Sequence, residues 1–242
     1  MIEIKNLKFC LEKFKLEIDF LKIEKNQKVA VLGENGSGKT TFLNLLSGFY
    51  KTEKSIKILD KFIEDINFHE RAKLISYLPQ FPDILFNFSV FETVLFGRYP
   101  HLKGFSYSKE DFEKTERILE KFSLEKFKHK SFAKLSGGEK KRVMLARALN
   151  QESEILLFDE PFANLDIKHS VEFLKILKDI KKTVICSIHD INLAVNGFKR
   201  FIFFKKGKII YDIEKEELNE KILFEVFEVN FIRSGNFFNF SI

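Results

Sequence analysis

The chain has 242 residues, of which 45% are hydrophobic and 31% charged, a balance typical of a globular protein and not of a disordered or fibrous one. Its 41 basic and 35 acidic residues give a net charge of +6 that is spread along the sequence, which favours a solvated surface over a nucleic-acid-binding groove. Two cysteines cannot form a disulfide framework, and no uncharged apolar run approaches the roughly 20 residues of a membrane-spanning helix. We expect one large domain or two small ones, with a phenylalanine-rich core, in a reducing compartment.

The first predicted elements are two antiparallel strands, residues 2–9 and 14–23. In the second, apolar side chains from Phe14 to Phe20 alternate with charged ones, so we expect one buried and one solvated face. From residue 28 the pattern changes to short, uninterrupted apolar runs, each followed by a segment compatible with a helix. Such runs predict parallel strands covered on both faces. They lie at residues 29–32, 155–158 and 184–188.

The strand pattern disappears between about residues 81 and 135, which predicts a helical insertion. Within it, Ser108 to Asp111 can begin a helix with a capping box, and apolar residues follow at helical spacing. Near the end of the chain, the apolar runs 201–204 and 209–211 predict a hairpin. Residues 215–227 predict a last helix.

A phosphate-binding loop is predicted at Gly33-Glu34-Asn35-Gly36-Ser37-Gly38-Lys39-Thr40. It matches G-x-x-x-x-G-K-[ST] directly after a buried strand and directly before an apolar helix. Its glycines let backbone N–H groups turn toward phosphate oxygens, and the helix start adds the positive end of its dipole. Lys39 can contact the β- and γ-phosphates, and Thr40, followed by Thr41, can offer its hydroxyl to Mg²⁺. We therefore expect a ligand with β- and γ-phosphates, together with Mg²⁺, at this loop.

Two acids, Asp159 and Glu160, follow the apolar strand 155–158. They are expected at the carboxyl edge of the sheet, where open α/β folds bind their ligands. Asp159 can serve as a ligand of Mg²⁺ and Glu160 as the base that activates the attacking water. Alone, such a pair is more often a solvated loop start, but the phosphate-binding loop favours the catalytic interpretation.

The segment Leu135-Ser136-Gly137-Gly138-Glu139 resembles the signature motif of ATP-binding cassette (ABC) ATPases, and a helical pattern continues from it to Leu149. A serine and two glycines at a helix start form a second anion site, although an ordinary capped helix has the same local pattern. The resemblance implies that Ser136 to Glu139 complete the nucleotide site of a second copy. Two chains would then pair head to tail around two ATP molecules.

The resemblance covers essentially the whole chain and implies further site residues. Gln80, after the predicted strand 74–78, would contact Mg²⁺ and the attacking water. His189, after the strand 184–188, would contact the γ-phosphate, and Asp166 would face the opposite copy. The other histidines are interpreted as structural; they are His69, His101, His129 and His169.

One position departs from the family pattern, in which an aromatic side chain of the first hairpin stacks on adenine. Leu11 stands there, and Phe9 or Phe14 could replace the missing ring, although Phe9 fits the core better. The resemblance implies an α/β fold for a single domain, residues 1–242. This fold has a RecA-like P-loop NTPase core (about 1–80 and 150–242) with an antiparallel β subdomain. Its helical insertion, about 81–149, carries the signature.

Two branches of the family are excluded. DNA-repair and chromosome cassettes need a long coiled coil between Lys39 and Glu160, and translation factors need two copies of each motif. Gly97-Arg98-Tyr99-Pro100-His101 resembles the ATPases of importers for iron chelates, haem and cobalamin. A soluble ATPase of iron–sulfur cluster assembly, or the ATPase of another transporter type, remains the alternative.

The importer resemblance implies a peripheral subunit on the cytoplasmic face of the cell membrane, bound to permease subunits. A substrate-binding protein would be an indirect partner only, and nucleic acid would not be a partner. The groove that couples the chain to the permease is expected between about Gln80 and Gly104. An excess of apolar side chains marks a partner surface there, namely Phe81, Ile84, Leu85, Phe86, Phe88 and Phe91.

Overall fold

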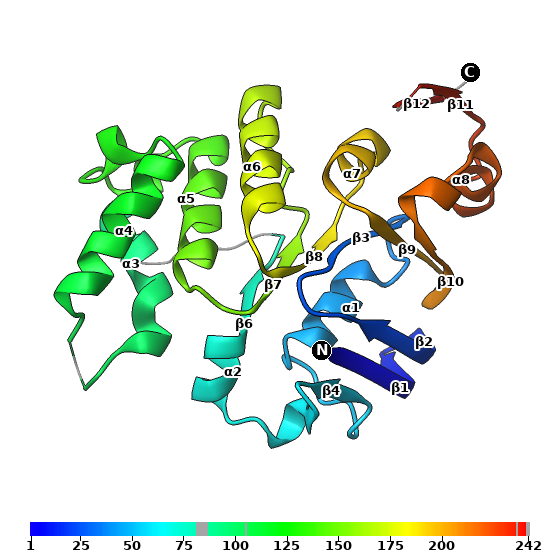
Figure 1. The fold of residues 1–242 in the computed structure, drawn as a ribbon, viewed down its shortest axis with the longest axis horizontal. Coiled ribbons are helices and arrows are strands. Elements are labelled where there is room, and N and C mark those ends of the chain that lie inside the picture. The colour runs from blue at the N-terminus through cyan, green and yellow to red at the C-terminus, as the bar shows by residue number, and fades with distance from the viewer. Residues whose placement is uncertain (81–86, 105, 236, 241–242) are drawn as a thin grey trace.

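A computed structural model describes residues 1–80, 87–104, 106–235 and 237–240. One large sheet forms the centre of the molecule, with helices on both of its faces (Figure 1). Its strands are β1 (Ile2–Leu11), β2 (Phe14–Ile23), β3 (Lys28–Gly33), β4 (Ile56–Ile58), β5 (Lys61–Phe62), β6 (Ile75–Leu78), β7 (Ile155–Asp159), β8 (Thr183–Ser187), β9 (Arg200–Lys205) and β10 (Lys208–Glu214). A separate hairpin joins β11 (Phe231–Ser234) to β12 (Phe237–Phe240).

Along the chain, helices separate the parallel strands of the sheet from one another. They are α1 (Lys39–Leu46), α2 (Phe68–Leu74), α3 (Val90–Leu95), α4 (Lys109–Lys121), α5 (Gly137–Asn150), α6 (Ile167–Asp179), α7 (Ile191–Gly197) and α8 (Glu220–Phe227). None of the helices in the described part of the chain combines the length and apolarity that crossing a bilayer requires.

Two pairing patterns meet in the sheet, whose strand order is β5-β4-β1-β2-β10-β9-β3-β8-β7-β6. The strands from β9 to β6 are parallel, whereas β1 pairs antiparallel with β2 and β4, and β10 with β9. The predicted parallel strands, the first antiparallel pair and the late hairpin are confirmed. Because β3, β7 and β8 are parallel neighbours, the loops that follow them meet at one edge of the sheet.

The parallel strands are buried on both faces, because consecutive residues point into two different cores. Val29 and Val31 of β3 pack with α1 and the antiparallel strands, whereas Ala30 and Leu32 pack with the helices of the opposite face. The core is rich in phenylalanine, as expected. Its fully buried rings are Phe42, Phe158, Phe173, Phe201, Phe203 and Phe204.

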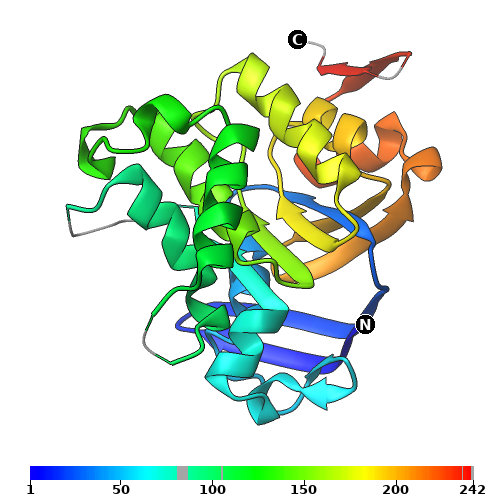
Figure 2. The same cartoon turned by 60° about the vertical axis from the view of Figure 1, so that its left-hand side comes forward.

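The described residues between 87 and 135 form helices joined by loops and, apart from one isolated bridge, Ser89 to Ser131, no strand, which agrees with the predicted insertion. Together with α5, its helices α3 and α4 form a layer beside the sheet (Figure 2). The capping box of α4 is present, since the hydroxyl of Ser108 accepts from the N–H of Asp111 and the Asp111 carboxylate accepts from the N–H of Ser108.

Phe20 was predicted on the buried face of β2, and this prediction is wrong, because its side chain is 59% exposed. Asn6 in the paired strand has φ 49°, a left-handed conformation that interrupts the pleat. Beyond that point the buried positions of both strands shift by one residue, so that Leu21 is buried instead.

The predicted last helix, 215–227, is also only partly right. Residues Lys215–Glu217 form a short 3₁₀ turn, and α8 begins after Asn219, whose side chain accepts from the N–H of Ile222. Asn219 starts this helix as its N-cap, which the apolar spacing alone does not reveal.

Candidate nucleotide-binding site

The predicted phosphate-binding loop connects β3 to α1, and two of its glycines are required by the backbone. Gly33 has φ 144°, and a Cβ there would lie 2.2 Å from the carbonyl oxygen of Phe204. Gly38 has φ 113°, and a Cβ there would lie 2.9 Å from the ring of Phe14. Gly38 is also the N-cap of α1 and provides no side-chain cap for the first N–H groups of that helix. These N–H groups can therefore bind an anion.

Lys39 begins α1 and is nearly buried, with 6% of its surface exposed. Its ammonium donates to the carbonyl oxygens of Gly33, at 2.8 Å, and Glu34, at 2.9 Å. Burial lowers the pKa of Lys39, while the carboxylates of Glu160 and Asp159 oppose this shift. The charge of Lys39 is thus held between the loop and the two acids that were predicted to share its site.

Asp159 ends β7 and is fully buried, so the interpretation of the acid pair as a solvated loop start is wrong for this residue. One of its oxygens, Oδ1, accepts from the Ser187 hydroxyl at 2.5 Å, while Oδ2 has no hydrogen-bond partner among the described residues. An unpartnered buried carboxylate oxygen is costly unless a cation or donor reaches it. Carboxylate and hydroxyl oxygens suit Mg²⁺, so this position fits the expected metal.

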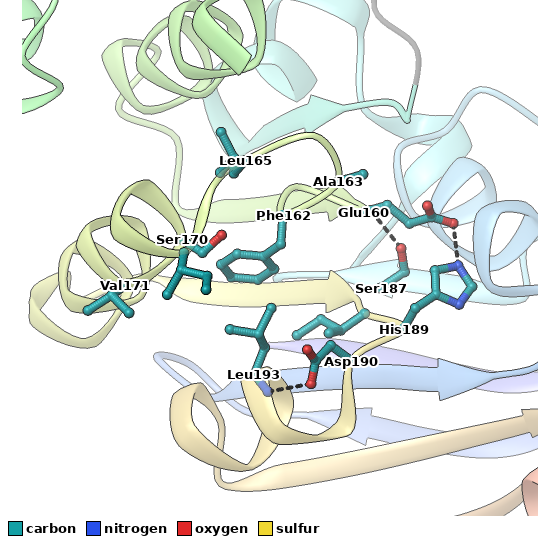
Figure 3. A pocket seen from close by; sticks show the side chains of 12 residues that line it. Glu160, Phe162, Ala163, Leu165, Ser170, Val171, Ser187, His189, Asp190 and Leu193 are labelled. Carbon is teal, nitrogen blue, oxygen red and sulfur yellow. Dashed lines mark hydrogen bonds and ion pairs between the residues drawn. The ribbon is translucent and has the colours of Figure 1, made fainter. Parts of the chain in front are cut away.

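Glu160 brings the three predicted catalytic residues into direct contact. Its Oε2 accepts from the side-chain amide of Gln80 at 2.6 Å, and its Oε1 lies 2.6 Å from Nε2 of His189. Figure 3 shows Glu160, Ser187 and His189 at the ends of their strands, with both side chains of the Glu160–His189 pair directed toward each other. A carboxylate held in this way can accept a proton from a water molecule.

Ser187 is a site residue that the sequence reasoning missed. Besides binding Asp159, its hydroxyl accepts from the backbone N–H of Glu160 at 2.9 Å, where Glu160 has φ 47°. Ser187 therefore fixes both acids. The signal that could have found it is its place at the end of β8, since a hydroxyl in a buried strand beside an acidic strand end needs a polar partner.

A cavity of about 520 Å³ brings together part of the predicted site, without Asp159 and His189. Gln80 and Glu160 line it together with the phosphate-binding loop and Thr41. Leu11 and Phe14 line it as well, whereas Phe9 packs on Tyr50 with ring centroids 5.0 Å apart. The aromatic surface of this cavity is therefore contributed by Phe14, and Phe9 lies against the core.

The signature segment does not line this cavity. Ser136 is the N-cap of α5, its hydroxyl accepting from the N–H of Glu139 while the Glu139 carboxylate accepts from the N–H of Ser136. Asp166 caps α6 in its own chain, accepting from the N–H of His169 and lying 2.8 Å from the His169 ring. Ser136, Gly137 and Asp166 are exposed and are available to another molecule.

Arg98, in the segment Gly97 to His101 that resembles importer ATPases, is buried. Its guanidinium binds Asp111 at 2.9 Å, the carbonyl oxygen of Asn150 at 2.7 Å and Glu152 at 2.9 Å. It therefore ties the insertion together, and a partner cannot reach it. Tyr99, in contrast, is 62% exposed.

Of the side chains expected in the coupling groove, Phe88 packs against Phe96 and Phe91 stacks on Phe112. Both rings therefore pack against other side chains of the insertion. The remaining four positions lie outside the described residues, and they are Phe81, Ile84, Leu85 and Phe86.

The fold and this site define a P-loop ATPase of the ABC cassette type. A family model described as "ABC transporter" matches residues 17–163. Among relatives, an uncharacterized ABC transporter ATP-binding protein of Methanocaldococcus jannaschii, MJ0089, is 37% identical over 86% of this chain and 83% of its own length. The "Probable iron chelatin transport ATP-binding protein" of Helicobacter pylori is 38% identical over 86% and 85%. The chain therefore belongs to the ABC transporter family, as an ATP-binding and ATP-hydrolysing subunit.

Solved structures agree with this assignment. The dimeric structure of MJ0796, a bacterial ABC transporter cassette, superposes with a TM-score of 0.80 at 27% identity, covering 90% of this chain and all (100%) of that one. An inward-facing ABC transporter assigned to the metal-chelate type superposes with a TM-score of 0.82 at 25% identity, covering 99% and 96%.

Proposed function

We propose that this chain is the ATPase subunit of a membrane importer for iron chelates or a related ligand such as haem or cobalamin. The observation that carries the proposal is its likeness to relatives named for such import, including a petrobactin import ATP-binding protein of Bacillus subtilis, YclP, that is 32% identical over 95% of this chain. The subunit binds permease subunits at the cytoplasmic face of the membrane and forms one domain over residues 1–242.

Within its own chain, the phosphate-binding loop holds the phosphates of ATP, with Lys39 as the cation. Thr40, Gln80 and Asp159 hold Mg²⁺, which neutralises charge on the phosphate oxygens when bound. Glu160 takes the proton of the attacking water, and His189 contacts the γ-phosphate. The contacts of Glu160 with Gln80 and His189, both at 2.6 Å, support these roles because they orient one carboxylate from two sides.

The signature acts on a second copy of the chain. Ser136 to Glu139, with Asp166, complete the nucleotide site of that copy in a head-to-tail dimer. Two observations support this arrangement. Ser136, Gly137 and Asp166 are exposed, and the segment is not among the residues that line the cavity of its own phosphate-binding loop.

The permease docks in a groove of about 330 Å³ between α2, α5 and the 3₁₀ helix Phe96–His101. Phe68 and Tyr99 line it and are 75% and 62% exposed. The charged residues among its described lining are Arg71 and Arg147. An apolar segment that carries an acidic side chain is the complementary partner.

Replacing both Phe68 and Tyr99 by serine tests this docking surface. We expect ATP hydrolysis by the isolated subunit to change little, because exposed substitutions usually alter stability by about 0.5 kcal/mol or less. Co-purification with co-expressed permease subunits, and transport in vesicles, should be lost. The matched control is Phe237→Ser, since that ring is 53% exposed on the distant hairpin.

Fractionation separates this function from the alternative. A subunit recovered wholly without membranes, bound to a scaffold protein of iron–sulfur cluster assembly, would contradict the importer proposal and leave the ATPase intact. Retained permease binding by the double variant would contradict the docking surface alone.

A further inference from the structure

Lys141 is a buried charge that the proposed function does not use. It lies in the second turn of α5, after the signature, and is 6% exposed. Lys39 and Lys141 are the two lysines that are buried within the described ranges 1–80, 87–104, 106–235 and 237–240. Burying an ammonium group is costly unless other groups compensate its charge, so this position requires an explanation.

The surroundings of Lys141 belong to the catalytic edge of the sheet. Its ammonium donates to the backbone carbonyl oxygen of Gln80 at 3.4 Å, the one hydrogen bond that its side chain makes with the described part of the chain. The acids whose charges act on it are Asp159 and Glu160. Burial lowers the pKa of Lys141, and the charges of these two carboxylates, of which Glu160 lines the cavity, oppose this shift.

Gln80 is therefore held at two points. Its side-chain amide donates to Glu160 at 2.6 Å, and its main chain accepts from Lys141. Gln80 stands just beyond β6, where strand hydrogen bonds no longer hold the backbone. A main-chain hydrogen bond at this residue restricts the backbone from which its side chain extends.

The opposite end of this connection is the signature helix. The adjacent residue, Arg142, is also buried and donates to the carbonyl oxygen of Phe122 in the insertion, at 3.2 Å. The start of α5 is thus bound to the catalytic edge through Lys141 and to the insertion through Arg142. A displacement of α5 would change the Lys141 to Gln80 contact directly.

We infer that Lys141 is a positioning residue for hydrolysis, whose ammonium fixes the main chain of Gln80 and thereby aims the Gln80 amide at Glu160. The inference rests on the proposed roles of Gln80 and Glu160. It links the orientation of the signature helix to the geometry around the water-activating carboxylate within a single chain.

The test compares Lys141→Met with Lys140→Met, the neighbouring lysine, whose ammonium lies 5.8 Å from the Phe132 ring centroid, away from Gln80. We expect Lys141→Met to lower kcat roughly 10- to 100-fold, since a misplacement of about 1 Å can have such an effect. The dissociation constant of a fluorescent ATP analogue should stay within about twofold of the wild-type value. For Lys140→Met, both kcat and this dissociation constant should stay within about twofold of the wild-type values. Lys141→Gln, which keeps a hydrogen-bond donor, should recover part of kcat and serves as the test if the methionine variant does not fold.

A double-mutant cycle with Gln80→Ala separates positioning from a structural role. If Lys141 acts through Gln80, Lys141→Met should lower kcat by no more than about twofold in the Gln80→Ala background. Equal losses in both backgrounds, or a loss no larger than that of Lys140→Met, would overturn the inference. Normal hydrolysis by Glu160→Gln would instead overturn the proposed chemistry, so the two failures can be distinguished.

Discussion

Helices α1 and α5 both begin at glycine-rich segments that can bind an anion, but their first turns are built differently. At α1, Gly38 is in a left-handed conformation and offers no side-chain cap, and the buried Lys39 follows it. At α5, Ser136 and Glu139 satisfy each other's backbone N–H groups in a capping box. The start of α1 therefore leaves donors and a cation for a ligand, whereas the first turn of α5 is capped by its own side chains, with Ser136 and Gly137 exposed.

This difference indicates a different task for each of the two glycine-rich segments. The α1 segment lines one cavity together with Gln80 and Glu160 of its own chain. At the α5 segment, Ser136 and Glu139 are engaged in the local cap. Chemistry is consequently expected at α1, and recognition of a nucleotide bound elsewhere at α5.

The largest effect is expected at the α1 cavity, from Glu160→Gln. Loss of the base should lower ATP turnover about 10²- to 10⁴-fold, while ATP binding persists because the phosphate-binding loop is unchanged. Phosphate release measures turnover, and size-exclusion chromatography with ATP should detect an ATP-bound dimer. Glu216→Gln, at an exposed site, is the control. Near-normal hydrolysis by Glu160→Gln would contradict the proposed role of Glu160 as the base.

An intermediate effect tests whether α5 serves a second copy. Lys39→Ala and Ser136→Arg chains should each be inactive, and their mixture should regain hydrolysis. A hybrid dimer holds one site with both lesions and one with neither, so the recovered rate should lie below that of the wild type. Trapped nucleotide should be measured together with released phosphate, because coupling between the two sites can abolish hydrolysis by a hybrid dimer. If hybrid dimers form and neither measurement recovers, Ser136 does not act on the partner's nucleotide.

The smallest effect concerns the cap of α5. The backbone N–H of Ser136, with its hydroxyl, holds the pKa of Glu139 below its ordinary value of 4.5, although burial opposes this shift. A lowered pKa in the folded state means that the cap stabilises the protein above pH 4.5 and stops doing so as the pH falls through the folded-state pKa.

Glu139→Gln should therefore lower the free energy of unfolding by about 0.5 kcal/mol at pH 7 and by less at pH values below 4.5. Urea unfolding of both proteins across this range measures the difference. Glu216→Gln should show no such trend. If the difference in the free energy of unfolding stays constant with pH, the ionised Glu139 side chain contributes nothing to stability.

Local patterns were sufficient for much of the fold and for the composition of the site. Short apolar runs identified β3, β7 and β8, because strands buried on both faces carry few polar positions away from their ends. Fixed spacing identified the loop from Gly33 to Thr40, since its conformation needs glycine at defined places. Parallel pairing then placed the loop, Asp159 and Glu160 at one edge. The individual roles of these residues stay predictions for the experiments above.

What the sequence determined was thus the set of elements and the residue types at the strand ends, because both depend on neighbours along the chain. The tertiary structure decided which side chains are buried and which atoms meet. It placed Arg98 inside the insertion, turned Phe20 outward and joined Gln80 to Glu160 and Lys141 across segments far apart in sequence. Burial and hydrogen-bond partners depend on distant segments packed against a residue, and no local pattern contains that information.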